Sequence, residues 1–380
     1  MEARTRIRPA TTFLLAAFLG ACSPGRSRSS ASPPLRERLS PCKPEGKDPL
    51  DAARIYLEQR RLNEALACSS QATALWPDDS NAHVQRADTL VALGRFDAAS
   101  MAYARALALS PENLDALIGA ADLFIAELEP NRERTELGLV YADRGLALTD
   151  DEEDPALRSE FAVLSATALN DLGQPDEALI RADKAIALDP KREDAVFEKA
   201  QALFELCRFD ESKSYFRQLR RSKDWGLQAR HHLGLIMERE GKWKEADAEL
   251  NRELPASVQM SSEAFSLQVK AAVEAFPPDV KSDLKAIPIS TEELPSEEDL
   301  LSGSVPLSPT ILGLFRGPSL TEDCGKEETG CRSVVLFRRN LLRTATNVQD
   351  LKKEIETTLW HEIGHLRGET DAELAARGLD

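Results

Sequence analysis

Small apolar residues recur along the middle of the chain with a period of 34 residues. Pro77 and Pro111 are 34 positions apart, and Pro190 closes a third clear copy. Alanines stand at equivalent places before these prolines: Ala53, Ala65 and Ala72, then Ala87, Ala99 and Ala106, then Ala166, Ala178 and Ala185. A period of this length predicts a repeat architecture whose successive units stack along the chain.

This pattern is similar to the tetratricopeptide repeat, and the resemblance covers residues 48–255 with about six copies. Three copies are degenerate. The copy at 114–150 has an insertion of about five residues near 128–134, the copy at 193–224 has Ser212 where alanine is usual, and the last keeps Gly234 and Ala246. The resemblance implies a right-handed α-solenoid whose concave groove binds an extended peptide or a partner protein. Repeats of this type also serve as spacers or scaffolds.

A second helical pattern lies near the end of the sequence. Asn347 is a capping residue, Asp350 falls in the first turn, and residues 347–366 contain no proline, so we expect a helix that stops at Gly368. His361, Glu362 and His365 form an H-E-x-x-H motif within it. The i,i+4 spacing puts both imidazoles on one face, where they can hold a tetrahedral Zn²⁺, and Glu362 lies beside them to act on water.

A third metal ligand has to come from the residues after the motif or from an upstream segment. The residues that follow offer Glu369, Asp371 and Glu373. We favour Asp371, because Gly368 can take a positive φ and reverse the chain over the helix face. An alternative is that residues 370–373 form a capping box that opens a short last helix over residues 371–377.

The motif and its surroundings resemble the small bacterial zincin-like metallopeptidases called minimal zincins. Residues 361–371 read H-E-x-x-H-x-x-G-x-x-D, and the resemblance extends over residues 262–380. It includes an opening helix at 265–277, the segment I-L-G-L-F-R-G at 311–317 and a strand at 334–339. Leu366 and Arg367 depart from the family's usual residues. The resemblance implies a small α+β domain with zinc on His361, His365 and Asp371, a catalytic Glu362, and peptidase activity.

The start of the sequence predicts export from a bacterial cell. Three arginines precede the apolar run 13–21, which is too short to span a bilayer and has the order of a secretory signal. The run ends in Leu19-Gly20-Ala21-Cys22, which resembles a lipobox. This implies a signal peptide at 1–21 and a lipoprotein anchored through Cys22 to a membrane, on its periplasmic or cell-surface side. An ordinary cleaved signal is the alternative. Residues 22–47, rich in Ser, Pro and Arg, predict a disordered tether.

The cysteines after Cys22 are odd in number, and an exported protein can oxidise them. We expect Cys324 and Cys331 to pair around the polar loop 325–330, with two free thiols as the alternative. Cys42 with Cys68 is a second, weaker pairing, and Cys207 is expected to be a buried helical residue.

The net charge and the absence of certain motifs argue against several classes of function. A net charge of −16 argues against nucleic-acid binding, which needs a basic face. The sequence contains no phosphate-binding glycine loop and no G-x-S-x-G, so nucleotide chemistry and serine hydrolysis have no support. Two hypotheses remain: a lipid-anchored zinc metallopeptidase whose repeats recruit a protein substrate, and a repeat-type scaffold with a non-catalytic zincin-like domain.

Overall fold

The computed structural model describes residues 42, 48–128, 131–250, 258–285, 287–303, 305–324 and 331–379. Within these ranges the chain forms two compact units. The first contains residues 42, 48–203 and 214–226, and the second contains residues 204–213 and the described residues from 227 onward. The boundary falls inside the repeats, so the last helical hairpin belongs to the same unit as the C-terminal domain.

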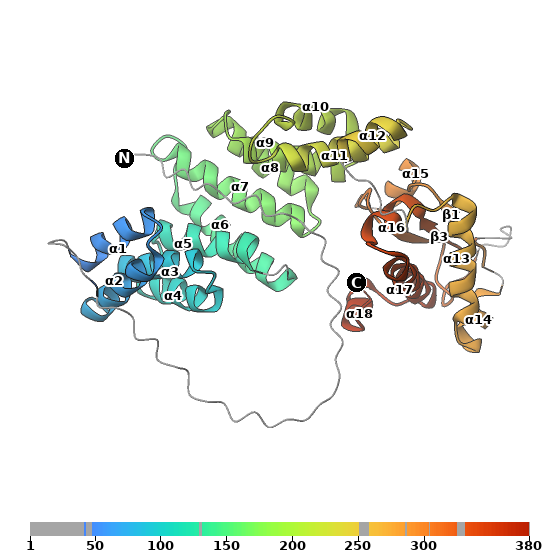
Figure 1. Ribbon diagram of the computed structural model, residues 1–380, viewed down its shortest axis with the longest axis horizontal. Coiled ribbons are helices and arrows are strands. Elements are labelled where there is room, and N and C mark those ends of the chain that lie inside the picture. The colour runs from blue at the N-terminus through green and yellow to red at the C-terminus, as the bar shows by residue number, and fades with distance from the viewer. Residues whose placement is uncertain are drawn as a thin grey trace, which may run out of the picture. The chain divides into compact units, whose positions relative to one another are not determined.

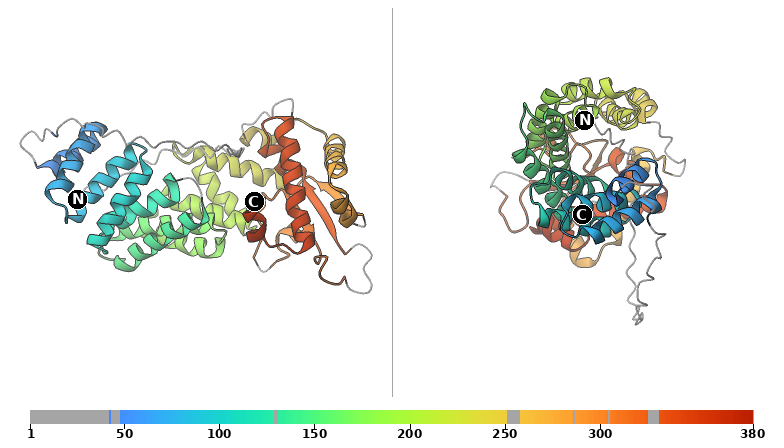
Figure 2. Two further views of the ribbon diagram at one scale, coloured as in Figure 1. Left: turned by 90° about the horizontal axis from the view of Figure 1, so that it is seen from below. Right: turned by 90° about the vertical axis from the view of Figure 1, so that its left-hand side faces the viewer.

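Twelve α-helices in the described part of residues 48–250 pair into six hairpins (Figure 1). In chain order they are α1 (Pro49–Glu58), α2 (Leu62–Leu75), α3 (Ser80–Ala92), α4 (Phe96–Leu109), α5 (Leu114–Asp122), α6 (Arg132–Leu148), α7 (Pro155–Asp171), α8 (Pro175–Leu188), α9 (Glu193–Glu205), α10 (Phe209–Leu219), α11 (Gly226–Arg239) and α12 (Trp243–Leu250). In the first unit the hairpins follow one another as an α-solenoid (Figure 2). The predicted α-solenoid is confirmed.

The repeated small residues explain why the helices pack closely. All nine alanines of the three clear copies are fully buried, and so is Ser212 at the equivalent place in a degenerate copy. Gly145 takes an alanine position in α6, where a Cβ atom would lie 2.2 Å from the ring of Phe161. Small side chains at these positions therefore let neighbouring helices approach, and an aromatic ring fills the remaining space.

The third hairpin carries the irregularity that the sequence predicts. Helix α5 continues into the π-helical turn η1 (Leu123–Glu127), and α6 begins at Arg132 after the N-cap Asn131. A π-turn holds one more residue per hydrogen-bonded ring than an α-turn. Part of the additional length is thus absorbed within the helix, while residues 129 and 130 lie outside the described ranges.

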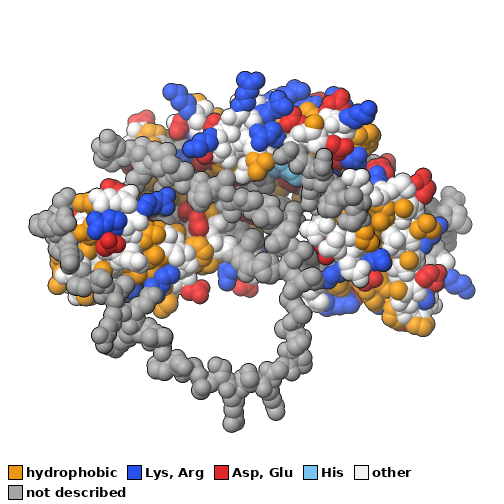
Figure 3. All heavy atoms as spheres, viewed as in Figure 1, with side chains coloured by type: hydrophobic (Ala, Val, Ile, Leu, Met, Phe, Trp, Pro, Cys, Tyr) orange, Lys and Arg blue, Asp and Glu red, His pale blue; other side chains and the backbone are white. Residues whose placement is uncertain are grey.

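Exposed apolar side chains mark the second helices of three consecutive hairpins. Met101 of α4, Val140 of α6 and Ile180 of α8 are all exposed, although each follows a buried small residue by two positions. Figure 3 shows apolar side chains on the visible surface of the first hairpins. We call these three residues the apolar row, because each gives its hairpin an exposed apolar side chain two positions after a buried small residue.

The C-terminal domain is built on a three-stranded sheet in the order β1-β3-β2. Strand β3 (Ser333–Phe337) lies between β1 (Ile289–Glu292), which is parallel to it, and β2 (Gly313–Arg316), which is antiparallel. The helices of this domain are α13 (Ser262–Ala275), α14 (Pro278–Leu284), α15 (Glu297–Leu300), α16 (Arg338–Thr344), α17 (Val348–Arg367) and α18 (Asp371–Ala376). The predicted small α+β arrangement is present.

Helix α17 and the sheet share one hydrophobic core. Apolar residues at helical spacing on α17 pack with α13 and with the inner residues of β3; they are Leu351, Ile355, Leu359, Ile363 and Leu366. Figure 2 shows the long helix running beside the strands. The remaining face of α17 is left to carry the histidines of the motif.

The predicted strand at 334–339 is wrong at its end. It stops at Phe337, which is paired with Glu292, the last residue of β1, and α16 starts at the next residue. Beyond that point β1 offers no backbone partner, and the amide of Arg339 donates to the carbonyl of Glu293 instead. A short helix therefore separates β3 from the motif helix.

Two disulfides are present among the described residues. Cys42 is bonded to Cys68, and Cys324 is bonded to Cys331. Cys207 is a free thiol, but the prediction of a buried helical residue is wrong: it lies half-buried in the turn between α9 and α10 with a φ of 58°. A helix cannot continue through a residue in that left-handed conformation.

The last hairpin contacts the C-terminal domain through charged residues within the second unit. Glu238 of α11 is almost completely buried and accepts hydrogen bonds from Arg339, at 2.7 Å, and from Arg343. The Arg339 guanidinium also lies over the ring of Trp243, 4.4 Å from its centroid. A buried carboxylate with two guanidinium partners fixes α16 against the last repeat.

In the part of the chain that the structure describes, no helix combines the length and the apolar character needed to cross a membrane.

Candidate metal centre

The motif helix begins and ends as the sequence predicts. The Asn347 side chain accepts hydrogen bonds from the amides of Gln349 and Asp350, at 2.8 and 3.0 Å. At the other end Gly368 has a φ of 91°, and the amide of Glu369 returns to the carbonyl of Gly364 at 2.9 Å. This left-handed turn reverses the chain directly after the second histidine.

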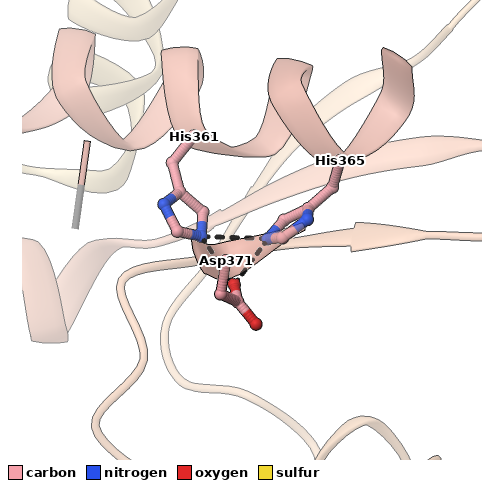
Figure 4. Close-up of side chains that lie close together, drawn as sticks. All are labelled: His361, His365 and Asp371. Carbon is pink, nitrogen blue, oxygen red and sulfur yellow. Dashed lines mark hydrogen bonds and ion pairs between the residues drawn. The ribbon is translucent and has the colours of Figure 1, made fainter. Parts of the chain in front are cut away.

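Three candidate ligands converge after that reversal (Figure 4). The Nε2 atoms of His361 and His365 are 3.0 Å apart. Asp371 Oδ1 lies 3.1 Å from His365 Nε2 and 3.6 Å from His361 Nε2. Both rings are partly buried, whereas the side chain of Asp371 is 86% exposed, so the cluster opens to solvent on the carboxylate side.

The far side of each imidazole contacts a backbone carbonyl. His365 Nδ1 is 3.0 Å from the oxygen of Glu369, and His361 Nδ1 contacts the oxygen of Leu379. A carbonyl only accepts, so each Nδ1 carries the proton and donates, which leaves both Nε2 atoms as lone pairs. Two lone pairs and a carboxylate oxygen that face one another at this distance suit a bound cation. The residues therefore fit a metal ion, and imidazole with carboxylate is a donor set that zinc accepts.

Asp371 lies against the histidines and is also the first residue of a short helix, so the two interpretations of the segment after Gly368 are compatible. Thr370 and Glu373 form the capping box of α18, and Asp371 is the first residue of that helix. Glu373 is engaged with the Thr370 amide at 2.8 Å, and Glu369 pairs with Arg377. Of the three carboxylates that the sequence offers here, Asp371 alone is placed against the histidines.

Glu362 is buried between the motif helix and strand β2. Its side chain is only 5% exposed, and a Cβ atom at Gly313 would lie 3.0 Å from its Oε1. Burial raises the pKa of Glu362 to about 8, the Phe315 amide lowers it by donating a hydrogen bond, and the negative Asp371 raises it. Gly313 thus leaves the space in which the carboxyl group sits, a role that the sequence pattern did not reveal.

Gly364 makes the corresponding space on the other side of the helix. It lies between the two histidines, and a Cβ atom there would be 2.3 Å from Leu374 Cδ2. Leu374 is the buried residue by which α18 packs on α17. The residue type alone marks Gly364 as a weak helix former, and its packing role depends on where α18 lies.

Comparison with known families agrees with both parts of the fold. The profile described as zincin-like metallopeptidase matches residues 284–379, and two tetratricopeptide-repeat profiles match residues 80–123 and 163–224. The chain contains tetratricopeptide repeats and a C-terminal zincin-like domain. Helix α13 precedes the matched range but packs into the same core.

Several solved repeat proteins are similar to this chain. One is PilW, a type IV pilus biogenesis factor, with 19% identity and a TM-score of 0.46 over 55% of this chain and 93% of that one. Pseudomonas aeruginosa pilF has 14% identity and a TM-score of 0.44 over 53% and 86%. YrrB, a repeat protein with an unusual peptide-binding site, has 18% identity and a TM-score of 0.38 over 48% and 89%. No curated protein sequence matches the chain.

The contact between Gly364 and Leu374 predicts a packing defect that weakens metal binding. Gly364→Ala should displace α18, and Asp371 with it, and lower zinc affinity about 10- to 100-fold, the range for loss of a supporting contact. Helix α17 itself should persist, because alanine is the better helix former. Competition with a chromophoric chelator measures the affinity, and adding Leu374→Ala should restore part of it. Unchanged affinity in Gly364→Ala would contradict the packing argument.

Proposed function

We propose that the zincin-like domain is a zinc-dependent peptidase, with the metal held by His361, His365 and Asp371. The observation that carries this proposal is the convergence of two Nε2 lone pairs and a carboxylate oxygen on the helix that also bears Glu362. Bound zinc supplies a Lewis acid that polarises the carbonyl of a peptide. The side chains around it then have to manage the proton and the substrate backbone.

Glu362 is the general base in this proposal. It follows His361 directly and is almost completely buried beside the two histidines. A carboxylate beside the metal can take a proton from the attacking water and return it to the leaving amine. Both transfers are needed to break an amide bond.

Strand β2 is suited to hold an extended substrate. It pairs with β3 on one side only, so its other side is an edge of the described sheet, and it lies next to α17. The carbonyl of Leu312 accepts a hydrogen bond from the amide of Phe337 in β3, whereas the amide of Phe315 lies close enough to Glu362 to lower its pKa. Edge strands bind extended peptides by backbone hydrogen bonds, so a substrate alongside β2 would pass close to Glu362.

The repeats would recruit the protein substrate or a partner. Tetratricopeptide repeats suggest protein interaction, and the apolar row of Met101, Val140 and Ile180 adds an exposed surface on three successive hairpins. Binding through the repeats would raise the concentration of a tethered substrate near the metal site without any change in the chemistry.

The peptidase proposal predicts that Glu362→Gln abolishes turnover and spares the metal. The amide keeps the size of the side chain but cannot accept the proton, so hydrolysis should fall about 10²- to 10⁴-fold. Glu354→Gln, a half-buried glutamate on the same helix, is the matched control and should cleave as the wild type does. The measurement is cleavage of a degenerate peptide library at equal zinc content. No cleavage by zinc-loaded wild type, or equal cleavage by Glu362→Gln, would support a scaffold in place of a peptidase.

We also propose that the protein is exported and anchored to a membrane by lipid on Cys22. The support for the lipid anchor is the sequence: the order of arginines, a short apolar run and the segment Leu19-Gly20-Ala21-Cys22. These residues lie outside the described ranges. The Cys42–Cys68 and Cys324–Cys331 disulfides agree with an oxidising compartment.

Anchoring through Cys22 predicts that Cys22→Ala removes the lipid. Metabolic labelling with a fatty acid in a bacterial host should label the wild type and leave the variant unlabelled, because Cys22 is then the acylated residue. Cys207→Ala, which removes the free thiol between α9 and α10, should be labelled like the wild type. Label that persists in Cys22→Ala would refute the anchor.

A further inference from the structure

The residues after the motif helix surround both imidazoles. We define the orienting tail as residues 369–379. It supplies Asp371 Oδ1 at the metal face of the cluster, the Glu369 carbonyl at His365 Nδ1, and the Leu379 carbonyl at His361 Nδ1. The carboxylate oxygen and the two carbonyl oxygens that contact the histidine pair thus all come from this short segment.

We propose that the Leu379 carbonyl is a positioning group for the metal site, and that the turn at Gly378 holds it in place. This inference rests on the proposed metal site. The two histidines differ in how they are held: the partner of His365 follows four residues later, inside the turn that ends α17, whereas the partner of His361 follows 18 residues later. His361 is therefore oriented only when the whole orienting tail is folded.

The end of α18 is built as a reversing turn. The amides of Gly378 and Leu379 donate to the carbonyls of Ala375 and Leu374, at 2.9 and 3.1 Å. Gly378 has a φ of 72°, which is left-handed and unfavourable for residues with a side chain. The turn brings the backbone of Leu379 back toward α17, so its carbonyl reaches the ring of His361.

Two contacts hold the orienting tail on the domain. Leu374 is buried against Gly364, and the Arg377 guanidinium pairs with the Glu369 carboxylate. The second contact joins the start of the tail to its end. The position of the Leu379 carbonyl is thus determined by packing, by an ion pair and by a glycine turn together.

The carbonyl fixes the proton on His361. A neutral imidazole has two tautomers and a rotatable ring, and only the form with a proton on Nδ1 presents a lone pair at Nε2. With the carbonyl in place this form is selected before a metal arrives. Without it, metal binding has to select both the tautomer and the ring orientation. Loss of such an outer contact typically lowers metal affinity about 10- to 100-fold.

The test replaces Gly378 by residues that differ in their tolerance of positive φ. Gly378→Val should displace the turn and weaken zinc binding about 10- to 100-fold, whereas Gly378→Asn should lose less, because asparagine adopts the left-handed region more readily. Among the described residues no atom lies within 4 Å of a Cβ added at Gly378, so the expected strain comes from the backbone. Gly94→Val is the matched control: its φ is 68°, its Cβ also meets nothing within 4 Å, and it lies in the turn between α3 and α4. It should bind zinc as the wild type does.

A second readout uses no metal. Nitrogen-15 NMR of histidine-labelled, zinc-free protein should show His361 with its proton on Nδ1 in the wild type, a mixture of tautomers in Gly378→Val, and an unchanged His365 in both. A wild type that carries the proton on Nε2 of His361 would overturn the inference, as would zinc affinities of Gly378→Val and wild type that agree within about twofold. If the wild type binds no zinc, the proposed function fails and the metal role of the Leu379 carbonyl fails with it, while the tautomer measurement still shows whether that carbonyl orients His361.

Discussion

Two imidazole lone pairs and a carboxylate oxygen held 3.0 to 3.6 Å apart repel one another unless a cation lies among them. Much of the C-terminal domain serves to hold these three groups together. Gly364 admits Leu374, which docks α18, and Gly368 turns the chain so that Asp371 faces the histidines. Gly313 gives Glu362 its place beside them. At Gly364 and Gly313 the absence of a side chain allows the close approach, and at Gly368 it permits the left-handed φ.

The second unit joins this centre to the last repeat. Glu238 of α11 holds Arg339 and Arg343 of α16, and the Asn340 side chain between these arginines donates to the carbonyls of Pro309 and Ile311 ahead of β2. Polar contacts thus run from a repeat helix through α16 to the segment that enters the edge strand. In this unit the last hairpin therefore packs against the zincin-like domain.

Structural features that depend on residue spacing along the chain could be predicted from local sequence signals. The period of 34 gave the helical hairpins, and Asn347 and Gly368 gave the limits of the motif helix, because capping and helical periodicity act over a few residues. Contacts between segments that are far apart in the sequence could not be predicted from these local signals. Leu379 and His361 are far apart in sequence, the room at Gly364 depends on where Leu374 packs, and α16 exists because β1 ends at Glu292. The prediction that Cys207 is a buried helical residue was wrong, because the residue type alone does not distinguish a left-handed turn from a helix.

The central claim is that His361, His365 and Asp371 bind one metal ion. Metal analysis of protein purified without chelator, followed by zinc titration, tests it most directly. We expect about one zinc per chain, held in the wild type and lost in His361→Ala and His365→Ala. His83→Ala, which removes a histidine in the repeats, should keep the zinc. Wild-type protein that contains no zinc and gains none on titration would contradict the account.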